Sequence, residues 1–230
     1  MTDEELGKVL DTVEIEPKTT VRASVIWMHG LGADAHDFEP IIPELRLPSE
    51  LGVRFVFPNA PVRAVTVNSG MRMRAWYDIK GIDLPRDEDT VGIRESERNV
   101  QALIRREVKR GLPVGRIVLA GFSQGGAIAL HTGLRYPDRL AGIVGLSCYM
   151  LLADSLAGER HPANQKIPIF MAHGVYDPVV PFQLGHAAFR QLQALDYDIE
   201  WNEYPMQHQV VWEEIWAIGE WLAKVLGESR

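Results

Sequence analysis

The chain has 230 residues, of which 46% are hydrophobic and 24% are charged, which is an ordinary balance for a globular protein. Lys and Arg total 24 against 31 for Asp and Glu, and the resulting net charge of −7 disfavours binding to nucleic acid. The single cysteine, Cys148, excludes an intramolecular disulfide and suits a reducing compartment.

The N-terminal residues lack the basic start and apolar stretch of a signal peptide, and no run of about 18 apolar residues occurs. We therefore expect a cytoplasmic protein without a transmembrane segment. The length predicts a single domain over residues 1–230. Nothing in the sequence decides the oligomeric state, and a homodimer is left open.

Short apolar runs alternate with helical patterns along the chain. Residues 11–17 are a candidate edge strand, and further strands are expected within residues 21–30, 53–61, 115–123, 140–150, 167–174 and 197–205. Helices are expected over residues 95–110, 124–136, 182–195 and 210–226. Several strands are apolar at successive positions, which is typical of strands buried on both faces of a parallel sheet. The pattern predicts an α/β fold with a mostly parallel central sheet and helices on both faces.

The segment Gly121-Phe122-Ser123-Gln124-Gly125 has the form G-x-S-x-G and lies between a predicted strand and a predicted helix. This is the context of a nucleophile elbow, in which a strained turn projects the serine hydroxyl from the edge of the sheet. Glycines on both sides allow neighbouring backbones to pass without a Cβ clash. We therefore predict that Ser123 is a nucleophile.

A serine hydroxyl needs a general base, and in this type of fold the acid and then the histidine follow the serine along the chain. His208 lies in a short connection before the last helix, whereas His186 falls inside a predicted helix, so His208 is favoured as the base. Asp177 follows a strand and a Gly turn and is favoured as the acid. Three other aspartates are less well placed, at positions 154, 196 and 198.

Acyl transfer also needs two N–H donors for the oxyanion. In this arrangement one comes from the residue after the nucleophile, Gln124, and the other from the loop after an early strand, where Gly30 and Gly32 flank Leu31. His29 and His173 each precede a glycine at a strand end and are interpreted as structural turn residues. No motif for a metal or a cofactor is present, so none is expected.

Several blocks together resemble the carboxylesterase/acyl-protein thioesterase family, also called the phospholipase/carboxylesterase family. They are VIWMHGLGAD, FPNAP, WYDI, GFSQGG, HGVYDPVVP and the final His208-x-Val, and they occur in the same order over residues 21–226. The resemblance implies an α/β-hydrolase fold without a large cap domain. It also implies a triad of Ser123, Asp177 and His208, with Leu31 and Gln124 in the oxyanion hole.

Two positions depart from the family pattern. Met28 replaces a Leu that is frequent before HGLG, and Gln207 precedes the histidine where Gly is usual. Neither change removes a catalytic group, and Gln207 is expected to affect substrate access.

Residues 64–90 are neither clearly helical nor clearly strand, and a connection of this length is usually functional or mobile. Its apolar side chains are candidates for the wall that binds an acyl chain. Ile79, Ile82 and Leu84 are favoured as the acyl-facing group, with Met71 and Trp76 as further candidates.

The predicted function is a serine carboxylesterase that cleaves short- to medium-chain aliphatic esters through an acyl-enzyme on Ser123. An acyl-protein thioesterase and a lysophospholipase are alternatives that would use the same catalytic residues. A non-catalytic binding protein on the hydrolase fold is the alternative from another class, and the intact set of catalytic residues argues against it. The expected partner is therefore a small ester or acyl-thioester substrate.

Overall fold

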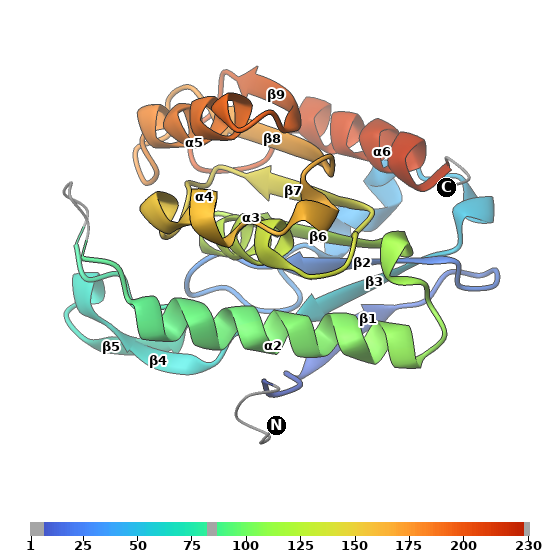
Figure 1. Cartoon of the computed structure of the whole chain (residues 1–230), viewed down its shortest axis with the longest axis horizontal. Helices are drawn as coiled ribbons and strands as arrows, with labels where there is room; N and C mark the ends of the chain where they lie inside the picture. The colour runs from blue at the N-terminus through green and yellow to red at the C-terminus, as the bar shows by residue number, and fades with distance from the viewer. Residues whose placement is uncertain (1–6, 82–86, 228–230) are drawn as a thin grey trace.

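The computed structural model describes residues 7–81 and 87–227. Its central sheet has seven strands in the order β1-β3-β2-β6-β7-β8-β9 (Figure 1). Only β1 is antiparallel to its neighbour β3, and the other neighbouring pairs are parallel. The strand bounds are β1 Thr12–Ile15, β2 Ala23–Met28, β3 Val53–Pro58, β6 Ile117–Phe122, β7 Gly142–Leu146, β8 Pro168–Gly174 and β9 Asp198–Tyr204. Every strand expected from the sequence is confirmed, including the edge strand.

The four predicted helices are also present, as α2 Thr90–Lys109, α3 Gln124–Arg135, α5 Phe182–Ala194 and α6 Trp212–Gly227. Helix α2 begins five residues earlier than predicted, because the carboxylate of Asp89 accepts a hydrogen bond from the Gly92 N–H and caps the first turn. Short helical segments complete the fold: α4 Leu156–Glu159 and the 3-10 turns η1 Glu39–Leu45, η2 Ser49–Leu51, η3 Thr66–Asn68, η4 Val114–Arg116, η5 Ala153–Ser155 and η6 Pro162–Asn164.

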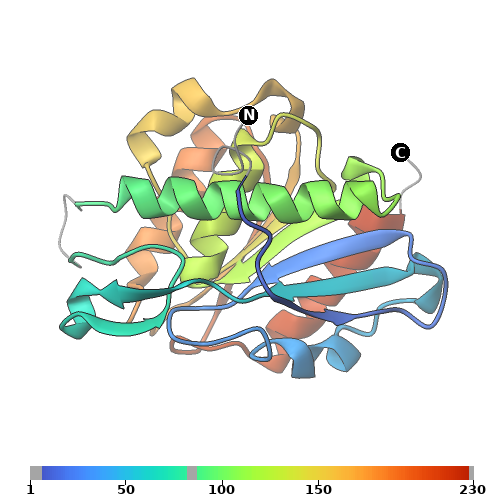
Figure 2. The same cartoon turned by 90° about the horizontal axis from the view of Figure 1, so that it is seen from below.

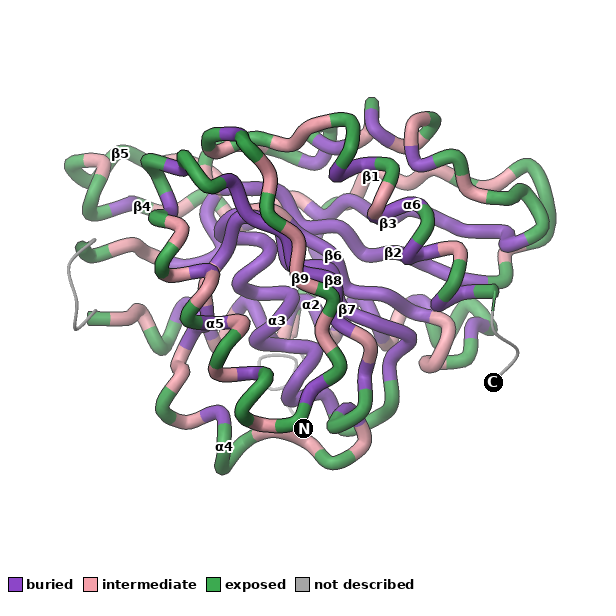
Figure 3. The backbone as a smooth tube through the Cα atoms, turned by 90° about the horizontal axis from the view of Figure 1, so that it is seen from above, coloured by how far each residue is buried: buried purple, intermediate pink, exposed green. Residues whose placement is uncertain are grey.

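The inner strands β2, β3, β6, β7 and β8 are buried on both faces, which explains why their sequences are largely apolar at successive positions (Figure 3). Along β2, Ile26 and Met28 belong to the hydrophobic core that includes residues of α2, α3 and α5. Val25 and Trp27 alternate with them and belong to the opposite core, which includes residues of α6 and η1. Over residues 7–81 and 87–227 the chain therefore forms a mostly parallel sheet between two helical layers, an α/β-hydrolase fold without a large cap domain.

The stretch over residues 64–90 contains a small hairpin that the sequence did not predict. Strand β4, Val62–Val65, pairs antiparallel with β5, Met71–Arg74, as a separate two-stranded sheet. Ser69 and Gly70 make the turn with positive φ angles of 56° and 75°. The hairpin projects beside the N-terminal end of α2, at one end of the molecule (Figure 2).

Candidate active site

The parallel strands bring distant segments to one edge of the sheet. Ser123 directly follows β6, and the loops after β8 and β9 carry Asp177 and His208. The loop after β2 carries Gly30 and Leu31. Because these four strands run in the same direction, their carboxyl ends lie together, and this is where α/β folds place their sites.

Ser123 occupies a strained turn between β6 and α3. Its backbone angles are φ 53° and ψ −119°, which a residue with a side chain rarely adopts. The Ser123 N–H donates to the carbonyl of Leu146 on the neighbouring strand at 2.8 Å. This hydrogen bond to the neighbouring strand helps to keep Ser123 in its strained conformation. The turn has the geometry of a nucleophile elbow.

The two glycines of G-x-S-x-G are required by close backbone contacts. A Cβ on Gly121 would lie 2.4 Å from the carbonyl carbon of Gly125. A Cβ on Gly125 would lie 2.3 Å from the carbonyl oxygen of Met28. Both separations are shorter than a Cβ can tolerate, so only glycine allows β6, α3 and β2 to approach in this way.

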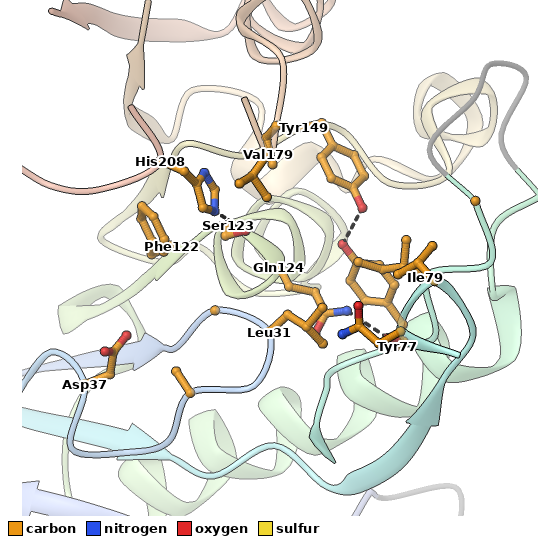
Figure 4. Close-up of a pocket in the computed structure, with 16 residues that line it drawn as sticks. Leu31, Asp37, Tyr77, Ile79, Phe122, Ser123, Gln124, Tyr149, Val179 and His208 are labelled. Carbon is orange, nitrogen blue, oxygen red and sulfur yellow. Dashed lines mark hydrogen bonds between the residues drawn. The ribbon is translucent and has the colours of Figure 1, made fainter. Parts of the chain in front are cut away.

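Ser123, His208 and Asp177 form a continuous chain of hydrogen bonds. The His208 Nε2 atom lies 2.9 Å from the Ser123 Oγ atom, and its Nδ1 atom lies 2.6 Å from the Asp177 Oδ2 atom. Because a carboxylate accepts the Nδ1–H, the Nε2 atom is left free to accept the serine proton. The structure thus brings together the three residues that the sequence predicted as a triad (Figure 4 shows the Ser123 and His208 side chains).

Asp177 is itself held in place by its own loop. Its Oδ1 atom accepts hydrogen bonds from the N–H groups of Val179 at 2.8 Å and Val180 at 2.9 Å. The His173 ring lies beside it, with its Nε2 atom 2.8 Å from the Val180 carbonyl oxygen and 3.6 Å from the Asp177 Oδ2 atom. Burial lowers the pKa of His173, which favours the neutral ring. A neutral His173 donates to Val180 and leaves Oδ2 to His208.

The loop after β2 lies next to Ser123. A Cβ on Gly30 would lie 3.6 Å from the Ser123 Cβ, and the Gly32 N–H donates to the Arg74 carbonyl at 2.9 Å. Leu31, between these glycines, lines the same pocket as Gln124, the first residue of α3. An N–H in the first turn of a helix has no partner within the helix and suits an oxyanion.

His29 has a structural position, as the sequence suggested. Its Nδ1 atom lies 2.6 Å from the Gly30 carbonyl oxygen, and its Nε2 atom accepts from the Ala60 N–H at 3.1 Å. The ring is 2% exposed, and burial lowers its pKa. A neutral His29 satisfies both contacts and joins the loop after β2 to the segment after β3.

An apolar pocket of about 350 Å³ opens at Ser123 and His208. One side carries Leu31, Tyr77, Ile79 and Tyr149, and the other carries Asp37, Phe122 and Val179 (Figure 4). The remaining lining residues in the described part of the chain are Gly30, Ala33, Val67, Asn68, Gly81, Gln124 and Val180.

Of the six residues predicted to bind substrate, only some lie at the pocket. Ile79 lines the pocket. Trp76 does not, because its ring is fully buried and its Nε1–H donates to the His29 carbonyl at 2.9 Å. Met71 is 65% exposed on β5, and Gln207 is also exposed; neither lines the pocket. Contrary to the prediction, Trp76, Met71 and Gln207 therefore do not line this pocket. Ile82 and Leu84 lie outside the described residues.

Tyr77 and Tyr149 also line the pocket, which was not predicted from the sequence, and their hydroxyl oxygens lie 2.8 Å apart. Tyr77 directly follows Trp76 in a stretch already suspected of binding substrate, and an aromatic pair there was a usable signal. Tyr149 follows β7, and no local pattern links it to Tyr77, because 72 residues separate them.

Other groups that carry chemistry are placed elsewhere. Cys148 is 1% exposed, and burial raises its pKa to about 12, so its thiol stays protonated. Within residues 7–81 and 87–227, no group of three or more His, Cys, Asp or Glu side chains is placed to hold a metal ion. In the same residues, no helix is both long and apolar enough to cross a bilayer.

Comparison with known proteins identifies relatives over most of the chain. Acyl-protein thioesterase 1 of Gibberella zeae is 40% identical over 213 residues, which cover 89% of this chain and 91% of the relative. The crystal structure of Arabidopsis thaliana SOBER1 superposes with a TM-score of 0.84 at 30% identity, covering 90% of this chain and all of that one. Zea mays acyl-protein thioesterase 2 gives 0.83 at 27% identity, covering 95% of this chain and all of that one.

A family model described as phospholipase/carboxylesterase matches residues 11–226. Among the described elements, this match spans β1 to β9 and α2 to α6 except the last residue of α6, and it contains every residue that lines the pocket. The chain belongs to the phospholipase/carboxylesterase family of α/β-hydrolases and is a serine hydrolase by class.

Proposed function

We propose that this protein hydrolyses acyl thioesters and carboxylic esters through an acyl-enzyme on Ser123. The observation that carries the proposal is the hydrogen-bonded chain Ser123–His208–Asp177 at an apolar pocket of about 350 Å³. The chain supplies a nucleophile with its base, and the pocket supplies a surface for an acyl group.

In the first half of the reaction, the Ser123 Oγ atom attacks the carbonyl carbon while its proton passes to the His208 Nε2 atom. The Asp177 carboxylate stabilises the imidazolium that forms. The carbonyl oxygen becomes an oxyanion and accepts hydrogen bonds from the N–H groups of Leu31 and Gln124. His208 then gives its proton to the departing thiolate or alkoxide, and the acyl group remains on Ser123.

In the second half, a water molecule attacks the acyl-enzyme in the same way. His208 takes a proton from the water and the oxyanion forms again at the same two N–H groups. Collapse of this intermediate breaks the bond to Ser123, whose Oγ atom recovers the proton from His208. The carboxylic acid leaves, and no cofactor is needed at any step.

The relatives favour a thioester over a small oxyester as the main substrate. The sequence alone placed carboxylic esters first, whereas the fungal relative at 40% identity is named acyl-protein thioesterase 1. Both leaving groups can use the same triad, so the choice rests on this similarity. We therefore propose S-acylated protein as the substrate class and carboxylesters as the second. The cytoplasmic location stays a prediction, and the oligomeric state stays open.

The test compares thioesters and oxyesters that carry the same acyl group, together with an S-acylated peptide. Thioester and peptide substrates should give the larger kcat/KM, and Ser123→Ala should abolish turnover of all of them. A fluorophosphonate should label Ser123, as read by mass spectrometry. Labelling at a different serine, or full activity of Ser123→Ala, would overturn the proposal. A clear preference for the oxyester would select the carboxylesterase.

A further inference from the structure

A second, smaller hollow lies directly against the catalytic pocket. Its volume is about 20 Å³, and four of its lining residues, Tyr77, Ile79, Gly81 and Tyr149, also line the catalytic pocket. The two hollows therefore share one wall, which we call the tyrosine wall and define by these four residues. The wall lies on the side of the pocket away from Phe122 (Figure 4).

A hydrogen bond joins the two tyrosines of the tyrosine wall. The hydroxyl oxygens of Tyr77 and Tyr149 lie 2.8 Å apart, and Figure 4 shows the two rings meeting end to end through this contact. The tyrosines come from different parts of the fold, one after β5 and the other after β7. The contact between the two tyrosines is made by side chains, so one substitution can remove it.

Tyr77 is the fixed half of the pair. It is 3% exposed, and its backbone carbonyl accepts a 2.8 Å hydrogen bond from the Gln124 side chain at the start of α3. Tyr149 is only half-buried, although it packs against the core that includes α2 and α3. Tyr149 is therefore the half that can be replaced with less disturbance of the fold.

The space behind the wall has an apolar component. Ile93 and Leu151 line it, and they are 0% and 1% exposed. Its charged groups already have partners: Lys80 pairs with Asp87 at 3.1 Å, Asp89 caps α2, and Glu88 accepts the Leu152 N–H at 3.1 Å. The hollow has room for about one water molecule, so an acyl chain cannot continue into it while the two tyrosine rings are in place.

We infer that the Tyr77–Tyr149 pair limits the length of acyl chain that the enzyme accepts, because the two rings stand at this side of the catalytic pocket and the hollow beyond them, of about 20 Å³, is too small to take a longer chain. The inference rests on the proposed function, since it assigns an acyl chain to this end of the pocket. A chain that reaches the wall gains apolar contacts with each added carbon. A longer chain must displace two packed rings or fold back into solvent. It therefore loses the free energy that further apolar contacts would have given.

The experiment replaces Tyr149 by Leu, which removes the ring and hydroxyl while keeping an apolar side chain. The readout is the ratio of kcat/KM for p-nitrophenyl palmitate to that for the butyrate, with intermediate lengths in between. This ratio should rise about tenfold or more in Tyr149→Leu. Tyr149→Phe keeps the ring and should retain nearly the wild-type ratio. Tyr176→Leu is the matched control, because that tyrosine is 67% exposed and does not line the pocket, and its ratio should not change.

A folded Tyr149→Leu protein with an unchanged ratio would overturn the inference. The wild-type protein provides a second test that depends on no variant. Alkyl fluorophosphonates of increasing length should label Ser123 faster up to a limiting length and then more slowly, and a rate that rises through the palmityl compound would also overturn it. Failure of the proposed function looks different, because wild-type protein would then neither hydrolyse the butyrate nor be labelled at Ser123.

Discussion

The carboxamide of Gln124 donates a 2.8 Å hydrogen bond to the backbone carbonyl of Tyr77, which joins the residue after Ser123 to the wall of the pocket. The same side chain accepts a 2.7 Å hydrogen bond from the Trp76 N–H. Gln124 therefore has two separate functions in this structure. Its backbone begins α3, and its side chain fixes the segment after β5.

Gln124→Ala should lower the free energy of unfolding by about 1–3 kcal/mol, because a buried N–H and a buried carbonyl lose their partner. The backbone N–H is kept, so activity toward a short ester should fall less than activity toward a long one. Denaturant unfolding and kcat/KM measure the two effects. Gln165→Ala, at an exposed position, should change stability by no more than about 0.5 kcal/mol. Equal stability of the two variants would contradict the anchoring role of Gln124.

Asp177→Asn should reduce kcat by up to about 10⁴, since an amide cannot stabilise the imidazolium as a carboxylate does. The fold should persist, because the Asn side-chain oxygen can still accept from the N–H groups of Val179 and Val180. Circular dichroism checks the fold and single-turnover kinetics checks the chemical step. A loss of less than tenfold would show that Asp177 is not the acid.

His208→Ala and His186→Ala should differ sharply. His186 lies in α5 among aromatic rings, with its ring centroid 5.8 Å from that of Phe182 and 5.9 Å from that of Trp201. Its removal should affect packing and leave kcat nearly unchanged, whereas His208→Ala should remove most activity. Steady-state kinetics on both purified variants gives the comparison. The opposite ranking would move the general base to α5.

Gly125→Ala should destabilise the protein by about 1–3 kcal/mol or more and remove activity, because the new Cβ meets the Met28 carbonyl oxygen at 2.3 Å. Gly158→Ala is the control. Gly158 lies in α4, and a Cβ there meets nothing within 4 Å, so the change should be neutral or slightly stabilising. Thermal unfolding of the two variants tests this. Near-identical melting temperatures would show that β2 and α3 can separate.

Glu214 should make stability depend on pH. It is fully buried in the first turn of α6, and burial raises its pKa from 4.5 to about 8. The folded state therefore keeps a proton that the unfolded state releases above pH 4.5, so this group lowers stability as pH rises from about 4.5 to about 8. The full effect is about 5 kcal/mol, at about 1.36 kcal/mol per unit of pKa shift.

Glu214→Gln removes the titration and keeps a similar volume. Relative to wild type, the variant should be more stable at pH 9 than at pH 5, by up to that amount. Denaturant unfolding of both proteins across this range measures the difference. A constant difference between the two proteins would show that Glu214 titrates normally.

The sequence predicted the chemistry of the site because that chemistry is encoded in local patterns. G-x-S-x-G requires glycine where Gly121 and Gly125 meet other backbones, and the contact distances explain why no other residue would serve. The inner strands could also be predicted from the sequence, because burial on both faces requires apolar residues at successive positions. The direction of parallel strands then placed the loops of Ser123, Asp177 and His208 at one edge.

The residues that line the pocket could not be predicted from local sequence patterns. Met71 and Trp76 are as apolar as Ile79, yet one is exposed on an unforeseen hairpin and the other is buried beneath the loop after β2. Apolar composition indicates that a side chain is suited to burial, and it does not state which surface the side chain faces. That direction follows from the β4–β5 turn and from the hydrogen bonds of Gln124.

Tyr149 illustrates what only the tertiary structure decided. It contacts Tyr77, which lies 72 residues earlier in the chain, because β7 and the segment after β5 both end beside α3. The spacing of residues along the sequence does not indicate this contact. Backbone conformation and strand burial depend on neighbours in the chain and leave a periodic signal. A contact between two loops depends on how whole elements pack, so it appears only when the chain is folded.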